Sequence, residues 1–212
     1  MQIVIKADAP QKEAILLKGI PANIMATWLA GEKAIPPADI YFDLLFEEEG
    51  SAFASITDKP VFVNAVIKTC TDLPANYIRF NGWNSFLQRE IIEMAGATTE
   101  MIASASGILE IMQWKYQIVA DIPGMISARV IAMIINEAYF GLGDEISTKK
   151  EIDTAMKLGT NYPYGPFEWG EKIGLHKIYA LLQTLYKQDK RYAVAPELEK
   201  EITFPTSKPI NK

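Results

Sequence analysis

The sequence has very little cysteine, histidine or clustered positive charge. Cys70 is the only cysteine and His176 the only histidine among 212 residues. A single cysteine excludes an intrachain disulfide and suits a reducing compartment. The usual ligands of a structural zinc site are also missing, so we expect no metal. A net charge of −5 without a basic stripe argues against nucleic acid as a partner, since phosphate binding needs clustered Lys and Arg.

Long apolar runs are absent as well. The opening segment, MQIVIKADAP, contains an apolar run that is too short for a secretory signal. The most apolar stretch, VIAMIINEAYFGL, is interrupted by Glu137 and falls far below the roughly 20 residues of a membrane span. We therefore expect a cytoplasmic protein without a membrane segment.

The first 121 residues mix strand-like and helix-like segments. Runs rich in Ile, Val, Tyr and Phe, several bounded by Pro, Asp or Gly, predict strands at 2–6, 40–46, 61–66, 77–81, 90–94 and 116–120. Helices are predicted at 10–19, 23–30 and 98–115. Strands that alternate with helices are typical of an α/β layer with a largely parallel sheet.

The pattern becomes helical after residues 121–124. Pro123 suits a first helical turn, and apolar residues then recur every four positions from Ile126 to Ala138. Thr148 and Glu151 have capping-box spacing and open a helix that Gly159 would end. Further helices are predicted from Pro166 to Gly174 and around 178–185, followed by an extended tail with one short helical piece and prolines at 196, 205 and 209. We divide the chain into an α/β domain, 1–121, and an all-helical domain, 122–212.

Residues 152–169, IDTAMKLGTNYPYGPFEW, read as a helix stop, a rigid turn and a helix start. Ile152, Ala155 and Met156 are expected to face a core, and the two prolines to fix the turn. Catalytic groups are sparse here, so periodicity favours a packing role.

The same region resembles a known family. DIPGMISARVIAMIINEAYFGL and EIDTAMKLGTNYPYGPFEWGEKIGLHKIYALLQTLY are similar to the C-terminal domain of 3-hydroxyacyl-CoA dehydrogenase, across roughly 117–202. The resemblance implies a truncated Rossmann-like α/β domain followed by a helical domain of the 6-phosphogluconate dehydrogenase C-terminal type. It further implies a homodimer through the helical domain, an acyl-CoA-like small molecule as ligand, and a place in fatty acid metabolism.

The family's NAD site is not found in the sequence. A dinucleotide fold uses Gly-x-Gly-x-x-Gly after its first strand. The corresponding segment, Lys6-Ala-Asp8-Ala-Pro-Gln11, has none of these glycines, and Asp8 would repel a diphosphate. The segment from there to IYFDLLFEEEG is also too short for the further strands of the family. We expect no NAD and no other cofactor.

The catalytic positions of the family are changed too. The family's catalytic histidine aligns with Asn81, which cannot serve as a general base, and its orienting glutamate with Glu93. By itself, Glu93 reads as a partly exposed strand carboxylate. Asn84 matches a substrate-contacting position, where its amide could contact a carbonyl, but the residue by itself favours a turn cap. The family's Asn-Thr-Ser-Ser segment becomes Asn-Ala-Val-Ile at 64–67, and its helix asparagine becomes Ala128.

No replacement chemistry is evident. His176 starts a helix and reads as a surface or capping residue, and Cys70 has no histidine nearby in sequence. The acidic run 47–49 reads as a solvated loop.

Three hypotheses follow. The first is a divergent homologue without hydride transfer that binds an acyl-CoA-type ligand, in a cleft lined by Trp83, Asn84 and Phe86, or acts as a dimeric interaction protein. The second is a working oxidoreductase with an unorthodox site, whose nucleotide site comes from a partner chain. The third is a structural dimer that docks onto a fatty-acid oxidation enzyme.

Overall fold

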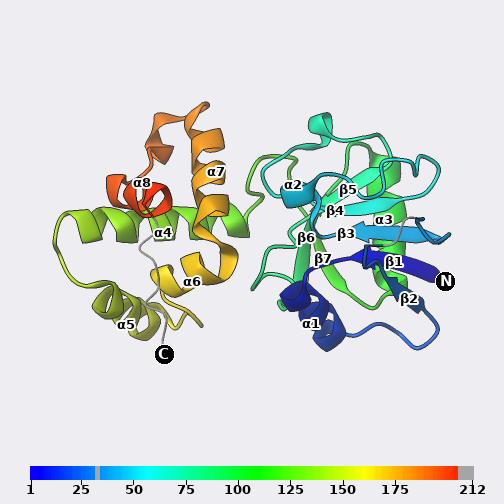
Figure 1. Cartoon of the computed structure of the whole chain (residues 1–212), viewed down its shortest axis with the longest axis horizontal. Coiled ribbons are helices and arrows are strands. Elements are labelled where there is room, and N and C mark those ends of the chain that lie inside the picture. The colour runs from blue at the N-terminus through cyan, green and yellow to red at the C-terminus, as the bar shows by residue number, and fades with distance from the viewer. Residues whose placement is uncertain (32–33, 205–212) are drawn as a thin grey trace. The chain divides into compact units, whose positions relative to one another are not determined.

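The computed structural model describes residues 1–31 and 34–204, and it forms two compact units, Met1–Ile126 and Ser127 onward (Figure 1). The first unit is built on a sheet, and the second is helical. None of the helices in these described ranges is long and apolar enough to cross a bilayer.

The first unit contains a seven-stranded sheet of order β2-β1-β3-β4-β5-β6-β7. All neighbouring strands are parallel except β5 and β6, which run antiparallel, so the predicted largely parallel sheet is confirmed. On the side of β1 away from β3 the sheet has only one strand, β2, whereas a full Rossmann fold has two strands there. The strands are β1 (Gln2–Lys6), β2 (Met25–Trp28), β3 (Ile40–Asp43), β4 (Val61–Asn64), β5 (Tyr77–Phe80), β6 (Ile91–Ala95) and β7 (Lys115–Ile118).

The two faces of the sheet are covered differently. On one face, Phe42, Phe62 and Phe80 form a core with helices α1 (Ala9–Lys18) and α3 (Thr99–Ile111). On the other face, Tyr41 and Tyr77 pack against the short helix α2 (Phe46–Glu49) and the loop that follows it. The second face therefore has little helical cover, which fits a reduced Rossmann-like layer.

One predicted helix is a strand. Residues 23–30 were expected to be helical, but Met25–Trp28 form β2 in register with β1. Met25 and Thr27 are exposed, whereas Ala26 and Trp28 pack against the core. This period of two is that of a strand, and the parallel pairing with β1 overrides the helical propensity of Met and Ala.

The second unit is organised around one long helix, which contacts the four other helices (Figure 1). The capping box at Thr148 and the helix from Pro166 to a cap at Gly174 are confirmed. Residues 127–204 contain no strand. The helices are α4 (Ser127–Gly143), α5 (Lys149–Thr160), α6 (Pro166–Ile173), α7 (Leu175–Tyr186) and α8 (Pro196–Thr203), and the short 3₁₀ helix is η2 (Lys190–Tyr192).

Two predicted helix ends are wrong. Pro123 lies in a turn, and α4 begins only at Ser127. Gly159 lies inside α5, which ends instead at Asn161 in the left-handed conformation, with φ 55°. Asparagine tolerates this conformation, so it competes with glycine as a helix cap. In the predicted tail, Pro196 opens α8, and Pro205 and Pro209 lie outside the described residues.

Candidate functional site

The candidate site is the edge of the sheet where the parallel strands β1, β3, β4 and β5 end. Ligands of open α/β sheets bind outside the carboxyl ends of the strands. Here those ends carry Lys6, Asp43 and Asn64, and Asn81 directly follows β5. Asp43, Asn64 and Asn81 at this edge are all buried.

At the start of α1, side chains of the same segment already accept hydrogen bonds from the backbone N–H groups of Asp8 and Gln11. The Asp8 carboxylate accepts the N–H of Gln11 at 2.7 Å, and the Gln11 side chain accepts the N–H of Asp8 at 3.0 Å. Gln11 is buried, and its amide also donates to the Leu44 carbonyl at 3.0 Å. Pro10 has no N–H to offer. A negative charge thus sits where a dinucleotide fold presents free N–H groups to phosphate.

Asn64 ties together the ends of two other strands. Its amide donates to the Leu44 carbonyl at 3.1 Å, and its oxygen accepts the Gly82 N–H at 3.0 Å. A Cβ at Gly82 would lie 2.9 Å from the Cβ of Asn64, so glycine is required for this close approach. The asparagine of the 64–67 segment is therefore engaged in structure.

Asn81 and Glu93 lie side by side. The Asn81 N–H donates to the Glu93 carbonyl at 3.0 Å across the antiparallel pair β5 and β6. Glu93 lies on a strand, as expected, but it is buried, with 9% exposure, and not partly exposed. It is buried because β6 is an interior strand between β5 and β7. The structure thus brings together the two positions that the sequence resemblance aligns with the family's base and orienting acid.

Two buried N–H donors next to this pair have no acceptor among the described residues. They are the side-chain amide of Asn81 and the indole of Trp83, at 2% and 0% exposure. Asn84 follows in the turn and is half-buried, and Trp83 packs edge-on against Phe86. Buried donors are normally paired, so these two N–H groups are exceptions.

The acidic run does not form a solvated loop. It forms α2, and Glu47 accepts the N–H groups of Ile67 at 2.7 Å and Lys68 at 2.9 Å. Burial raises the pKa of Glu47 despite these bonds. Sequence reasoning missed this because the two amides come from a loop 20 residues away. Within residues 1–31 and 34–204, no three His, Cys, Asp or Glu side chains are placed to hold a metal.

Cys70 is not a reactive thiol. Burial, with a smaller effect of Asp121, raises the pKa of Cys70 to about 11, so the thiol stays protonated at neutral pH. Asp121 accepts the Cys70 N–H and forms an ion pair with Arg79. Arg79 is fully buried and also donates to the carbonyls of Ala65 at 3.0 Å and Val66 at 3.1 Å. This arginine, which the sequence pattern did not single out, holds the loop after β4.

The motif at 152–169 is a helix cap. The Asp153 carboxylate accepts the N–H of Phe167 at 2.8 Å and that of Glu168 at 3.3 Å, at the start of α6. A Cβ at Gly165 would lie 2.2 Å from an Asp153 oxygen, so this position requires glycine. In the same unit His176 is exposed at the start of α7, and Ala128 is buried.

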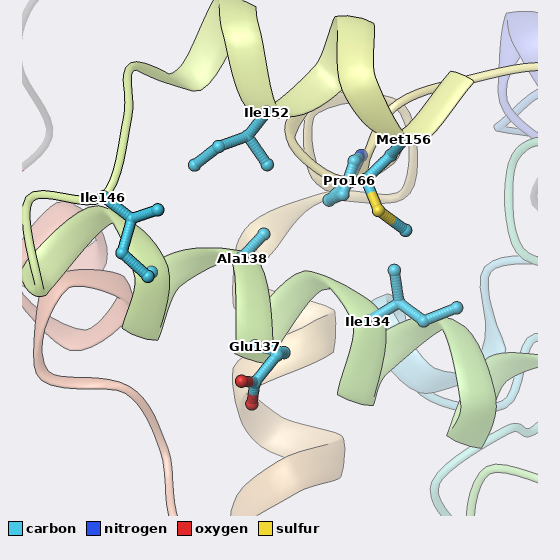
Figure 2. Close-up of a pocket in the computed structure, with 8 residues that line it drawn as sticks. Ile134, Glu137, Ala138, Ile146, Ile152, Met156 and Pro166 are labelled. Atoms are coloured by element: carbon cyan, nitrogen blue, oxygen red, sulfur yellow. The ribbon is translucent and has the colours of Figure 1, made fainter. Parts of the chain in front are cut away.

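The apolar side of α5 lines a groove and not a closed core. Figure 2 shows Ile134 and Ala138 of α4 pointing toward Ile152 and Met156 of α5, while the Glu137 carboxylate points away. Ala155, expected to face a core, is exposed. The groove has a volume of about 330 Å³ and its walls are almost wholly apolar.

Comparison with known families identifies the helical unit. Residues 124–204 match the family model described as 3-hydroxyacyl-CoA dehydrogenase, C-terminal domain. A 3-hydroxyadipyl-CoA dehydrogenase of Escherichia coli (strain K12) is 51% identical over 67 residues, which are 32% of this chain and 14% of the relative. A 3-hydroxybutyryl-CoA dehydrogenase of Clostridioides difficile is 29% identical over 141 residues, which are 64% of this chain and 50% of the relative. The chain spans half or less of the length of these curated relatives.

Solved structures extend the likeness to the fold of both units. The (S)-3-hydroxybutyryl-CoA dehydrogenase of Ralstonia eutropha superposes with a TM-score of 0.69 at 17% identity, over 95% of this chain and 93% of that one. A 3-hydroxybutyryl-CoA dehydrogenase of Escherichia coli K12 gives 0.59 at 29% identity, over 69% and 32%. The predicted fold, a Rossmann-like unit followed by a helical one, is confirmed.

Proposed function

The helical part of this chain, residues 124–204, belongs to the 3-hydroxyacyl-CoA dehydrogenase family, and from this premise we propose that the protein binds an acyl-CoA-like small molecule without transferring hydride. The main support is the cap at the start of α1, where the side chains of Asp8 and Gln11 bond each other's backbone N–H groups. The Asp8 carboxylate occupies the place where the pyrophosphate of a dinucleotide would need free N–H groups.

The base position supports the same conclusion. Asn81 lies beside Glu93 and cannot accept a proton near neutral pH. Neither a histidine nor a thiolate replaces it in the α/β unit, because the unit contains no histidine and the Cys70 thiol stays protonated. Loss of a general base alone costs about 10²–10⁴ in rate.

The binding part of the proposal rests on the two unpaired donors. The Asn81 amide and the Trp83 indole present N–H groups that a ligand carbonyl, such as that of an acyl thioester, would satisfy. We further propose that the protein is a cytoplasmic homodimer, as the family resemblance implies.

A thermal-shift panel on the full chain tests this function. We expect butyryl-CoA to raise the melting temperature and NADH and NAD to leave it unchanged, since a ligand at 100 times its dissociation constant stabilises a fold by about 2.7 kcal/mol. Trp83→Phe keeps an aromatic six-membered ring but removes the N–H together with the pyrrole part of the indole. It should lower the stability of the protein and weaken the butyryl-CoA response by about 0.5–1.5 kcal/mol.

The matched control is Trp114→Phe. The Trp114 indole already donates to the Gly19 carbonyl at 2.8 Å, so this change should lower stability and leave the butyryl-CoA response intact. A clear response to NADH would overturn the proposal.

A second candidate is an active oxidoreductase that takes its nucleotide site from a partner chain. The similarity to the Clostridioides difficile enzyme over 141 residues favours it, since this match extends beyond the helical unit. Oxidation of 3-hydroxybutyryl-CoA with NAD, abolished by Asn81→Ala, would establish this activity and refute the first proposal.

A further inference from the structure

Strand β2 is the last strand at one end of the sheet, and its outer side pairs with no strand among the described residues (Figure 1). On its inner side, the N–H groups of Met25 and Leu29 donate to carbonyls of the neighbouring β1 segment at 2.9 and 2.8 Å. Successive residues of a strand direct their backbone groups to opposite sides. The N–H and C=O groups of Ala26 and Trp28 therefore face outward, and no residue of 1–31 or 34–204 bonds them there.

The strand at the other end of the sheet, β7, is by contrast protected. The Val119 N–H donates to a β6 carbonyl at 3.0 Å, so the backbone groups of Ile118 face outward. The side-chain amide of Gln117 donates to the Ile118 carbonyl at 3.0 Å, and Lys115 at the start of the strand pairs with Glu90. Charged residues of this kind keep sheet edges from pairing with other chains. Strand β2, with the sequence Met-Ala-Thr-Trp, carries no charge.

Apolar side chains border the open edge on both faces of the sheet. On one face Met25 is 66% exposed. On the other face the Lys12 ammonium lies 5.0 Å from the centre of the Trp28 ring, which places this side of α1 beside β2. Leu16 follows four residues after Lys12 on the same side of α1 and is 57% exposed. An uncharged open edge flanked by exposed apolar side chains favours pairing with another strand.

The strand is self-complementary. When two copies of β2 run antiparallel with Thr27 opposite the partner's Thr27, Ala26 lies opposite the partner's Trp28, and the symmetric contact forms at the same time. Both contacts join outward-facing backbone groups, so each pair exchanges two N–H···O bonds. A slip by one residue would place outward-facing groups opposite inward-facing ones, which fixes the register against that alternative.

We propose that a second copy of this chain pairs its β2 with this edge, antiparallel about Thr27, so that two seven-stranded sheets become continuous. The contact lies in the α/β unit and is separate from the homodimer that the family resemblance implies through the helical unit. The backbone groups set the orientation, and Met25 and Leu16 add apolar burial beside the new strand pair.

Charges at Thr27 test the register by sedimentation velocity on the full chain. The Thr27 side chain is exposed, so the fold tolerates a charge there. Thr27→Lys and Thr27→Glu should each weaken the association at least about tenfold, because each places like charges opposite one another across the two-fold axis. The average molar mass should then fall about twofold. An equimolar mixture of the two variants should regain the wild-type mass, since opposite charges then face each other.

A second variant tests the backbone pairing itself. Ala26→Pro removes an outward-facing N–H that both pairs use, and proline is tolerated in an edge strand where the N–H faces solvent. It should lower the molar mass as the charged variants do. The matched control is Gln117→Lys, an exposed change on the opposite edge, which should leave the wild-type mass unchanged.

Three outcomes would overturn the inference. They are a wild-type monomer at tens of micromolar, a molar mass that none of the three β2 variants changes, and a mixture of Thr27→Lys and Thr27→Glu that stays at the lower mass while the circular dichroism of both is native. The butyryl-CoA response separates this result from the proposed function. A variant that loses β2 pairing and still responds to butyryl-CoA leaves the proposed function standing.

Discussion

The buried polar side chains of the α/β unit hold loops in place. Arg79 binds the carbonyls of Ala65 and Val66 and pairs with Asp121, and Glu47 binds the amides of Ile67 and Lys68. Both side chains thus fix the same loop after β4. Substitution of such buried groups costs more stability than substitution of exposed charges does.

Glu47 gives a prediction about pH. Burial raises its pKa above the ordinary 4.5, so the folded protein keeps this proton to higher pH than the unfolded chain. The stability that this proton contributes is present below pH 4.5 and is lost as pH rises through the folded-state pKa. Glu47→Gln keeps an acceptor for the two amides and removes the titration. We expect the free energy of unfolding of Glu47→Gln to fall less steeply above pH 4.5 than that of the wild type. The two slopes should differ by at most about 1.4 kcal/mol per pH unit.

Urea unfolding at a series of pH values measures this effect. Glu48→Gln, which replaces an exposed neighbour, serves as the control and should keep the wild-type slope. Equal slopes for wild type and Glu47→Gln would contradict the burial argument.

At the scale of elements, contacts from distant residues decide where helices and strands begin. The start of α6 depends on Asp153, which lies on the preceding helix. β2 exists because β1 offers a parallel edge to residues that would otherwise suit a helix. Local propensity is a weak prior that such contacts override.

The cap of α6 gives the second prediction. Asp153→Ala removes the acceptor for two N–H groups at the helix start and should lower the free energy of unfolding by about 1–2 kcal/mol. Asp153→Asn retains an amide oxygen and should lose less. Far-UV circular dichroism in urea measures both changes, with Asp144→Ala at an exposed position as control. A cost for Asp144→Ala as large as that for Asp153→Ala would remove the special role of the cap.

At the scale of the whole molecule, two units with separate cores carry different parts of the proposed function. The α/β unit holds the candidate ligand site, and the family resemblance implies that the proposed dimer forms through the helical unit. The chain spans half or less of its curated relatives.

Self-association gives the third prediction. When folding and dimerisation are linked, the melting temperature rises with protein concentration by mass action. We expect the melting temperature of the protein to rise over a hundredfold range of concentration. Differential scanning calorimetry at several concentrations checks this, and a constant wild-type value would count against the dimer.

The sequence by itself determined those features that depend on neighbouring residues. The strand runs β1, β4 and β5, the capping box at Thr148, the helix from Pro166 to Gly174 and the missing glycine loop are all local patterns. The family resemblance added the prediction of a two-unit fold.

Only the tertiary structure decided where distant polar groups meet. The contact of Asn64 with Gly82, the burial of Glu47 and the network around Arg79 all join segments that are separate in the chain. Such contacts follow from sheet order and loop packing, and a residue pattern of period 2 or 3.6 carries no information about them.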